Sequence, residues 1–204
     1  MSCSSAREAA TVLPQMLQCC PKRHRRAMPK ILYVCTSNTC RSPAAATIAR
    51  AHLEKIGRTD VQIASRGLTD RYSAWGSPPD PRAEKALESA TGLSSQGHAS
   101  SKLTAAEVDG CDALFYFMRE HIEWIAGCVG KAPVKRALES GRLRIVRPPD
   151  GIPDPFFADD AFYGDVMGML QTHVAIALDQ VLAGAHAFEV YRKSQEGKAR
   201  ARPG

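Results

Sequence analysis

Short apolar runs alternate with amphipathic stretches along most of the chain, and this alternation predicts the secondary structure. Four apolar runs predict strands at residues 31–34, 61–64, 113–117 and 143–146. Apolar residues at helical spacing predict helices at residues 44–56, 82–89, 119–127 and 160–182. Strands that alternate with helices indicate right-handed βαβ units and a parallel sheet covered on both faces. The predicted fold class is therefore α/β.

The segment after the first predicted strand carries candidate chemistry, with the sequence C-T-S-N-T-C-R-S-P at residues 35–43. Cys35 stands where the strand ends, and Arg41 follows after five intervening residues. A cysteine at a strand-to-helix turn can be held as a thiolate by the positive end of the helix. Backbone N–H groups of such a turn can bind a phosphate, and an arginine can donate two hydrogen bonds to its oxygens. The spacing indicates a nucleophile in an oxyanion cradle, against the simpler alternative of a buried cysteine beside a surface arginine.

Three more residues of this segment fit the same interpretation. Pro43 suits the first turn of a helix, where its missing N–H is not needed. Ser42 can donate its hydroxyl to a Cys35 thiolate. Asn38 tolerates the left-handed backbone that a tight anion-binding loop tends to need.

Four motifs resemble those of the low-molecular-weight protein-tyrosine phosphatases, and they occur in the order of that family. They are V-C-T-S-N-T-C-R-S-P at 34–43, S-P-P-D-P-R at 77–82, G-H-A-S at 97–100 and D-P-F-F at 154–157. The resemblance covers about residues 29–185. It implies a three-layer, flavodoxin-like sandwich with a four-stranded parallel sheet of order 2-1-3-4. In such a sheet the loop of Cys35 lies at the carboxyl ends of the strands, where ligands bind.

The resemblance also implies the site residues. Cys35 is the expected nucleophile, Arg41 the phosphate clamp and Asp154 the general acid and base; without the resemblance, Asp154 would be an ordinary turn residue. The expected substrate-binding residues are Thr36, Ser37, Asn38, Thr39, Cys40, Ser42 and Phe156. Ser65 and His98 are expected to support the loop through hydrogen bonds with Asn38 and Ser42, although His98 as a general base is the rival assignment. No metal and no cofactor are implied.

The substrate is left open between two chemistries. A phosphotyrosine protein is the first expectation, with phosphorylated proteins or peptides as partners. Thr39 supports the alternative, because C-T-S-N-T-C-R-S is similar to the loop of bacterial protein-arginine phosphatases. The pocket wall is expected at Tyr72 or Trp75, and Phe156 and Phe157 leave no tyrosine there to be phosphorylated.

Cysteine spacing bears on two further hypotheses. Thioredoxin-coupled arsenate reduction is disfavoured, because Cys111 and Cys128 are far apart for a redox pair. Cys40 is either a packed small residue or a resolving thiol that forms a disulfide with an oxidised Cys35, which would give redox regulation. Seven cysteines without an apolar signal sequence indicate a reducing compartment.

The formal charge of +6 is concentrated in the tails of the chain. Residues 31–191 hold sixteen Lys/Arg against nineteen acids, so the body has a net charge of −3 and nucleic acid is not an expected partner. No apolar run is long enough to span a membrane, although the tails could contact anionic lipid weakly.

The expected organisation is an N-terminal extension, one catalytic domain and a C-terminal tail. Residues 1–28 form a basic, disordered extension, 29–190 the phosphatase domain and 191–204 a basic tail. The extension could be a mitochondrial transit peptide, a membrane-associated tail acylated at Cys19 or Cys20, or a segment without a specific role. The expected location is the cytoplasm, with mitochondria as the alternative.

Overall fold

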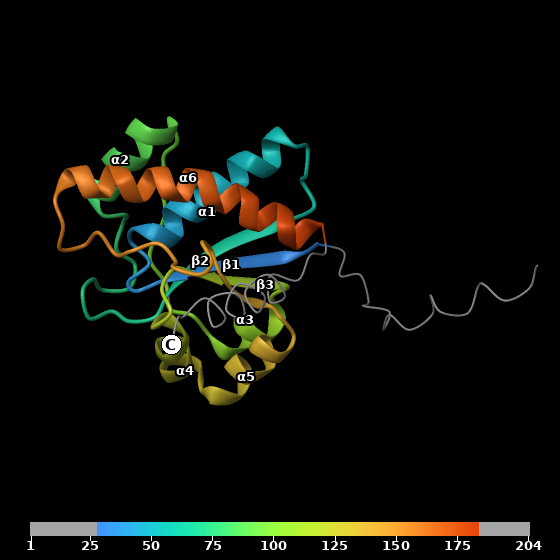
Figure 1. Cartoon of the computed structure of the whole chain (residues 1–204). Helices are drawn as coiled ribbons and strands as arrows, with labels where there is room; N and C mark the ends of the chain where they lie inside the picture. Colours follow the sequence, from blue (N-terminus) through green and yellow to red (C-terminus); the bar gives the residue numbers. More distant parts are fainter. Residues whose placement is uncertain (1–27, 184–204) are drawn as a thin grey trace, which may run out of the picture.

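The computed structural model describes residues 28–183, which form a parallel sheet with helices on both faces (Figure 1). The strands are β1 (Lys30–Cys35), β2 (Gln62–Gly67), β3 (Ala113–Tyr116) and β4 (Leu143–Ile145). Their order in the sheet is β2-β1-β3-β4, and all three pairings are parallel. The predicted fold class and strand order are confirmed. The expectations for the extension up to residue 27 and for the tail from residue 184 concern residues outside the described part.

Within residues 28–183, three helices cover each face of the sheet. One face carries α1 (Arg41–Lys55), α2 (Pro81–Thr91) and α6 (Asp160–Leu182). The other face carries α3 (Ala105–Gly110), α4 (His121–Val129) and α5 (Lys131–Glu139). The sheet therefore separates two hydrophobic cores, as in the expected three-layer sandwich.

Strand β1 lies in the middle of the sheet and contributes to both cores. Ile31, Tyr33 and Cys35 face the core beneath α1 and α6, whereas Leu32 and Val34 face the core beneath α3, α4 and α5. All five residues are buried because side chains alternate between the two faces of a strand and both faces are covered. The carboxyl end of β1 is thus a firmly held position, and the candidate nucleophile is its last residue.

The structure adds two helices that the hydrophobic pattern did not predict, α3 and α5. The other eight elements occur where they were expected, with ends shifted by a few residues. The helix expected from residue 44 begins at Arg41, so that Pro43 lies in its first turn. Within residues 28–183, no helix is both long and apolar enough to cross a membrane.

Candidate active site

The loop of residues 36–40 connects β1 to α1 at the carboxyl ends of the parallel strands. Cys35 ends β1 and Arg41 begins α1, so the two candidate catalytic residues stand at opposite ends of this loop. The loop is held from both sides. Leu68 and Thr69 donate backbone hydrogen bonds to the carbonyl of Thr36, at 2.8 and 3.0 Å, and the N–H of Asp80 donates to the carbonyl of Thr39 at 2.8 Å.

The Cys35 sulfur is buried and lies 3.0 Å from the Ser42 hydroxyl oxygen. The Ser42 oxygen also accepts a hydrogen bond from Asn38 Nδ2 at 2.9 Å. Its own proton therefore remains available, and the Cys35 sulfur is nearer than its other acceptor, the Arg66 carbonyl at 3.4 Å. In this arrangement the Ser42 hydroxyl is within reach to donate a hydrogen bond to the Cys35 sulfur.

Asn38 is the centre of the hydrogen bonds that shape the loop. It has a φ of 59°, in the left-handed region, and its side chain is fully buried. Its amide donates to Ser65 Oγ at 3.0 Å as well as to Ser42, and its side-chain oxygen accepts from the N–H of Ser101 at 3.0 Å. These bonds hold the backbone in a conformation that few residue types adopt without cost.

His98 lies on the support side of the loop. Its Nε2 is 2.8 Å from the Asn38 carbonyl oxygen, which can only accept, so Nε2 carries the proton. Burial lowers the pKa of His98, and the hydrogen bond to Asn38 opposes this shift. His98 lines a separate cavity against α1, whereas the cavity beside Cys35 is lined by other residues. This geometry fits the expected support role and leaves the rival role as general base without a contact to the reaction site.

Arg41 is almost completely buried, and its guanidinium is fixed by three acceptors. One nitrogen donates to the carbonyl of Ile152 at 3.1 Å. Another donates to Thr36 Oγ1 at 3.3 Å and forms an ion pair with the Asp154 carboxylate. Arg41 Nε is buried without a protein partner. A buried guanidinium nitrogen normally has an acceptor, so this unused donor fits a phosphate oxygen in the cradle.

Asp154 reaches the cradle from the loop that follows β4. One carboxylate oxygen accepts from Thr36 Oγ1 at 3.2 Å, and the other accepts from the N–H of Phe156 at 3.2 Å. The loop is held close to β3, because the N–H of Ile152 donates to the Phe117 carbonyl at 2.7 Å. Gly151 makes this approach possible, since a Cβ there would lie 2.1 Å from that carbonyl oxygen and its φ is 80°.

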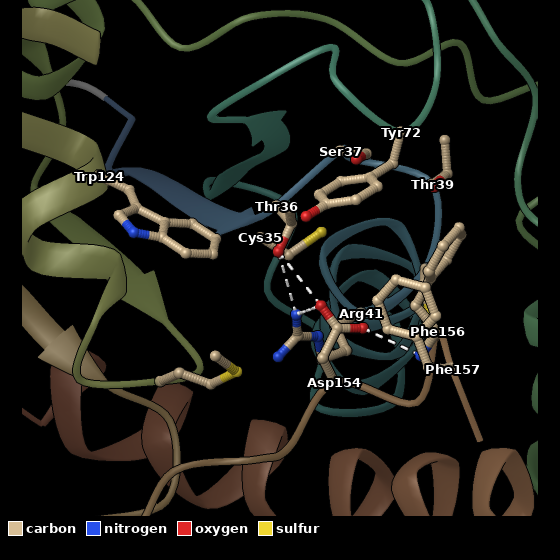
Figure 2. A pocket seen from close by; sticks show the side chains of 12 residues that line it. Cys35, Thr36, Ser37, Thr39, Arg41, Tyr72, Trp124, Asp154, Phe156 and Phe157 are labelled. Atoms are coloured by element: carbon tan, nitrogen blue, oxygen red, sulfur yellow. Dashed lines mark hydrogen bonds and ion pairs between the residues drawn. The ribbon is translucent and has the colours of Figure 1, made fainter. Parts of the chain in front are cut away.

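A cavity of about 180 Å³ opens above Cys35 and Arg41 (Figure 2). Tyr72, Phe156 and Phe157 form an aromatic cluster on one side of it, with ring centroids 4.9 to 6.3 Å apart. Tyr72 was one of the two residues expected to form the wall. The cavity thus combines a polar floor with an apolar side, which suits a phosphate group attached to a flat ring.

Most of the expected site residues line this cavity. Those that do so are Cys35, Thr36, Ser37, Thr39, Cys40, Arg41, Asp154 and Phe156. Asn38 and Ser42 are exceptions, because their side chains are fully buried in the support network and do not face the cavity.

Three residues of the site region differ from the sequence expectations. Trp75 does not line the cavity, because its ring packs against the backbone of Gly67. Sequence reasoning missed Met118 and Trp124, which both line the cavity. No motif marks these two residues. Met118 lies just after the end of β3, where the ligands of such sheets bind, whereas Trp124 lies within α4.

The other cysteines of the body differ in their surroundings. Cys40 lines the cavity and is partly buried; burial raises the pKa of its thiol, while the charge of Arg41 opposes this effect. Cys111 and Cys128 belong to the core on the α3–α5 face, and their thiols donate to the carbonyls of Val108 and Leu103. Neither lines the cavity above Cys35. Within residues 28–183, no group of three or more His, Cys, Asp or Glu side chains is placed to hold a metal ion.

Comparison with known proteins identifies similar sequences and structures. The family model for the low molecular weight phosphotyrosine protein phosphatases matches residues 30–185. The low molecular weight protein-tyrosine-phosphatase Etp of Escherichia coli (strain K12) is 30% identical over 141 residues, covering 69% of this chain and 86% of Etp. The protein-arginine-phosphatase of Bacillus subtilis (strain 168) is 31% identical over 102 residues, covering 50% of this chain and 63% of that protein. The structure of Vibrio vulnificus Wzb in complex with benzylphosphonate has a TM-score of 0.62 at 21% identity, covering 75% of this chain and 99% of Wzb.

Proposed function

The chain belongs to the low molecular weight phosphotyrosine protein phosphatase family, and we propose that it hydrolyses phosphotyrosine in proteins through a phosphocysteine intermediate. Membership makes it a phosphoric monoester hydrolase of the protein-tyrosine-phosphatase type. The observation that carries the proposed mechanism is the 3.0 Å contact between the Cys35 sulfur and the Ser42 hydroxyl, in a loop that ends at the buried Arg41.

In the proposed first step, the Cys35 thiolate attacks phosphorus opposite the tyrosine oxygen. The S–P bond forms while the bond from phosphorus to the tyrosine oxygen breaks. Asp154 gives its proton to that oxygen, so the leaving group departs as neutral tyrosine. Arg41 and the loop N–H groups bind the three equatorial oxygens, whose charge they stabilise in the transition state.

In the proposed second step, water hydrolyses the phosphocysteine. Asp154, now a carboxylate, accepts a proton from the attacking water, and inorganic phosphate leaves with the new P–O bond. The S–P electron pair returns to Cys35 as a thiolate, which the Ser42 hydroxyl stabilises from 3.0 Å. Each turnover therefore consumes one water and restores both catalytic residues to their starting states.

The contacts of Asp154 support its place as the acid and base. Its carboxylate shares Arg41 and Thr36 Oγ1 with the cradle, which brings it beside the position of the reacting phosphate. A phosphate that binds Arg41 competes with Asp154 for the same guanidinium. Such competition frees one oxygen of the Asp154 carboxyl group to turn toward the leaving oxygen, while the other oxygen still accepts the hydrogen bond from the Phe156 N–H.

The aromatic side of the cavity supports phosphotyrosine as the substrate. The rings of Tyr72 and Phe156 have centroids 5.5 Å apart beside the cavity, and a phenyl ring can pack against such surfaces. Phosphoarginine is the second candidate, because Thr39 lines the same cavity and the Bacillus subtilis relative is a protein-arginine-phosphatase. A threonine hydroxyl could hydrogen-bond to the phosphoramidate nitrogen.

Parallel hydrolysis of matched phosphotyrosine and phosphoarginine peptides tests the proposal. We expect a higher kcat/KM on phosphotyrosine, and rapid acid quench should trap phosphate on Cys35. Cys35→Ser should abolish turnover while phosphate still binds, because the cradle consists of backbone and Arg41. Turnover by Cys35→Ser at the wild-type rate would refute the mechanism. A large preference for phosphoarginine would make phosphoarginine, rather than phosphotyrosine, the substrate.

A further inference from the structure

The cavity has a second apolar side, formed by Trp124 and Met118. Both residues line the cavity together with Cys35. In Figure 2, Trp124 lies across Cys35 and Arg41 from Phe156 and Phe157 and comes from a different part of the chain. Trp124 is 42% exposed, so a large apolar surface faces solvent at the mouth of the cavity. Exposed apolar surface of this kind beside a reaction site indicates a contact with substrate.

The Trp124 ring is held in place by the start of α4. It packs against the ring of His121, with centroids 5.6 Å apart. His121 is fully buried, and its Nδ1 accepts a hydrogen bond from the N–H of Phe117 at 3.4 Å. Burial lowers the pKa of His121 to about 3, so the ring beneath Trp124 stays uncharged. Ile125, the next residue of the helix, is anchored in the core. Trp124 is therefore a preformed surface.

The two apolar sides of the cavity differ in their residues and in their position relative to Cys35. Tyr72, Phe156 and Phe157 pack on one another and form a continuous wall beside the cradle. Such a wall can receive the phenyl ring of the phosphorylated residue. Trp124 lines the same cavity but lies on the other side of the Cys35 sulfur. A phenyl ring bound at the wall would leave this second side open to another part of the substrate.

We propose that Trp124 and Met118 form a subsite for an apolar side chain that neighbours the phosphotyrosine in the substrate protein. This inference rests on the proposed phosphotyrosine phosphatase activity and narrows its substrate class. Proteins with a leucine, isoleucine, valine or phenylalanine next to the phosphotyrosine are preferred over those with a charged residue there. The subsite acts by burying apolar surface, so its contribution depends on the size of the neighbouring side chain.

Matched phosphotyrosine peptides test the subsite. Leucine, alanine, lysine or glutamate is placed in turn at the two positions that precede the phosphotyrosine and at the two positions that follow it. At one of these positions, the wild-type kcat/KM should be about tenfold higher for leucine than for alanine, as expected for a few buried methyl groups. Trp124→Ala should bring this ratio close to one, and Met118→Ala should lower it partly. Ile176→Ala, which removes an exposed apolar side chain of α6, is the matched control and should keep the ratio.

A charge-introducing variant gives an independent readout. Trp124→Glu places a carboxylate in the subsite, so the preferred neighbour should change from leucine to lysine at the same peptide position. This change of preference compares substrates within one variant, and it is therefore unaffected by a general loss of active protein.

The failure of the subsite differs from the failure of the proposed function. If the wild type cleaves all phosphotyrosine peptides with equal kcat/KM, the subsite is refuted and the phosphatase activity stands. If Trp124→Ala slows every peptide by the same factor, Trp124 belongs to the wall for the phosphotyrosine ring and the inference is also wrong. If the wild type cleaves none of the peptides, the proposed function fails and the subsite with it.

Discussion

Removing the side chain of Asn38 tests whether the loop conformation depends on its support network. Asn38→Ala deletes three buried or partly buried hydrogen bonds, those with Ser42, Ser65 and Ser101. It also puts an alanine at a φ of 59°, which Asn tolerates better. Ser42 then loses the partner that orients its hydroxyl toward the Cys35 sulfur. Both the stability of the fold and the rate of turnover should fall.

The expected loss of stability for Asn38→Ala follows from the contacts. Three hydrogen bonds at about 0.5–1.5 kcal/mol each give about 1.5–4.5 kcal/mol. The left-handed backbone adds about 1–2 kcal/mol for alanine. The sum, roughly 2.5–6.5 kcal/mol, is a large fraction of the 5–15 kcal/mol typical of a domain. Asn38→Gly loses the same bonds without the left-handed cost, but its more flexible unfolded chain costs about 0.5–1 kcal/mol. The glycine variant should therefore be the more stable by roughly 0.5–1 kcal/mol.

Urea unfolding and steady-state hydrolysis of an aryl phosphate measure the two effects. We expect kcat to fall by on the order of 100-fold in both Asn38 variants, because a displaced reacting group costs about that much. Thr91→Ala is a matched control, since it removes two side-chain hydrogen bonds at the end of α2, away from the cavity. It should lose stability and keep its kcat. Asn38 variants within about 1 kcal/mol of the wild type, or an equal loss of kcat in Thr91→Ala, would refute the reasoning.

Three further predictions concern the reaction, and a fourth concerns the pH dependence of stability. Asp154→Asn should strongly slow phosphates with weakly acidic leaving groups, such as phosphotyrosine, and spare those with acidic leaving groups, which need little protonation; equal loss for both kinds would make Asp154 a structural residue. Thr39→Ile should raise the preference for phosphotyrosine over phosphoarginine by about tenfold, and unchanged ratios would exclude Thr39 from substrate choice. Cys40→Ser should make inactivation by peroxide harder to reverse with dithiothreitol, because the oxidised Cys35 then lacks a thiol with which to form a disulfide and release water. Equal recovery of the wild type and the variant, with no disulfide-linked Cys35–Cys40 peptide by mass spectrometry, would contradict this. The pKa of His121 is lowered to about 3 in the folded protein, so below pH 6.5 the unfolded state binds a proton that the folded state does not, and the free energy of unfolding falls as the pH decreases toward 3. His121→Gln should reduce this dependence by up to about 1.4 kcal/mol per pH unit, as measured by urea unfolding at a series of pH values. An unchanged pH dependence would contradict the prediction.

The central strands β1 and β3 could be predicted from the sequence because they are buried on both faces, whereas only Ser65 and Gly67 are buried in the edge strand β2. Strands buried on both faces appear as apolar runs, and the run at β1 is the clearest example. The helix α3 was missed because it has only six residues and buries only Val108, whereas α5 was missed although it is as long as α4. A local signal existed at α3, where Thr104 and Glu107 form a capping box.

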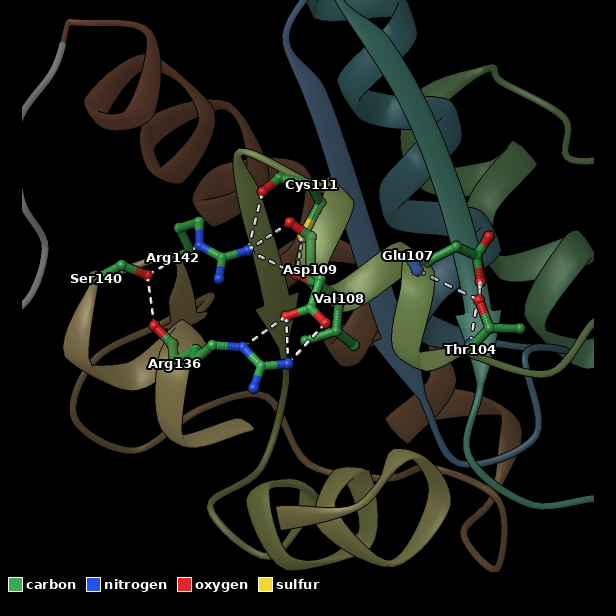
Figure 3. Close-up of polar contacts among 8 residues, drawn as sticks. All are labelled: Thr104, Glu107, Val108, Asp109, Cys111, Arg136, Ser140 and Arg142. Carbon is green, nitrogen blue, oxygen red and sulfur yellow. Dashed lines mark hydrogen bonds and ion pairs between the residues drawn. The ribbon is translucent and has the colours of Figure 1, made fainter. Parts of the chain in front are cut away.

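Polar contacts join α3 and α5 (Figure 3), in addition to the apolar core that contains Val108 of α3 and Val134 and Ala137 of α5. Arg136 of α5 pairs with Asp109 of α3, with a shortest separation of 2.7 Å, and Arg142 donates to the carbonyls of Val108 and Cys111. These partners are 27 to 34 residues apart in the chain. Pairings at such separations depend on the tertiary fold, so a pattern of apolar residues does not reveal them.

The site could be predicted where its residues are close in sequence. Cys35, Arg41 and Ser42 are held together by one loop and one helix start, and spacing alone brought them together. Asp154 lies 113 residues beyond Arg41, and only a family motif assigned it. Trp124 has no motif, and its place in the cavity results from the packing of α4.

The S-P-P-D-P-R motif was recognised from the sequence without a physical role, and its contacts supply one. The Asp80 N–H donates to the Thr39 carbonyl, while the Asp80 side chain caps α2. Arg82 donates to the Phe156 carbonyl at 3.2 Å, and its guanidinium carbon lies 5.9 Å from the centroid of the Phe156 ring. One short segment thus contacts both the loop that carries Cys35 and the loop that carries Asp154. In the proposed mechanism the acid and the nucleophile need a fixed separation, so this double contact is expected to hold Asp154 in position relative to Cys35.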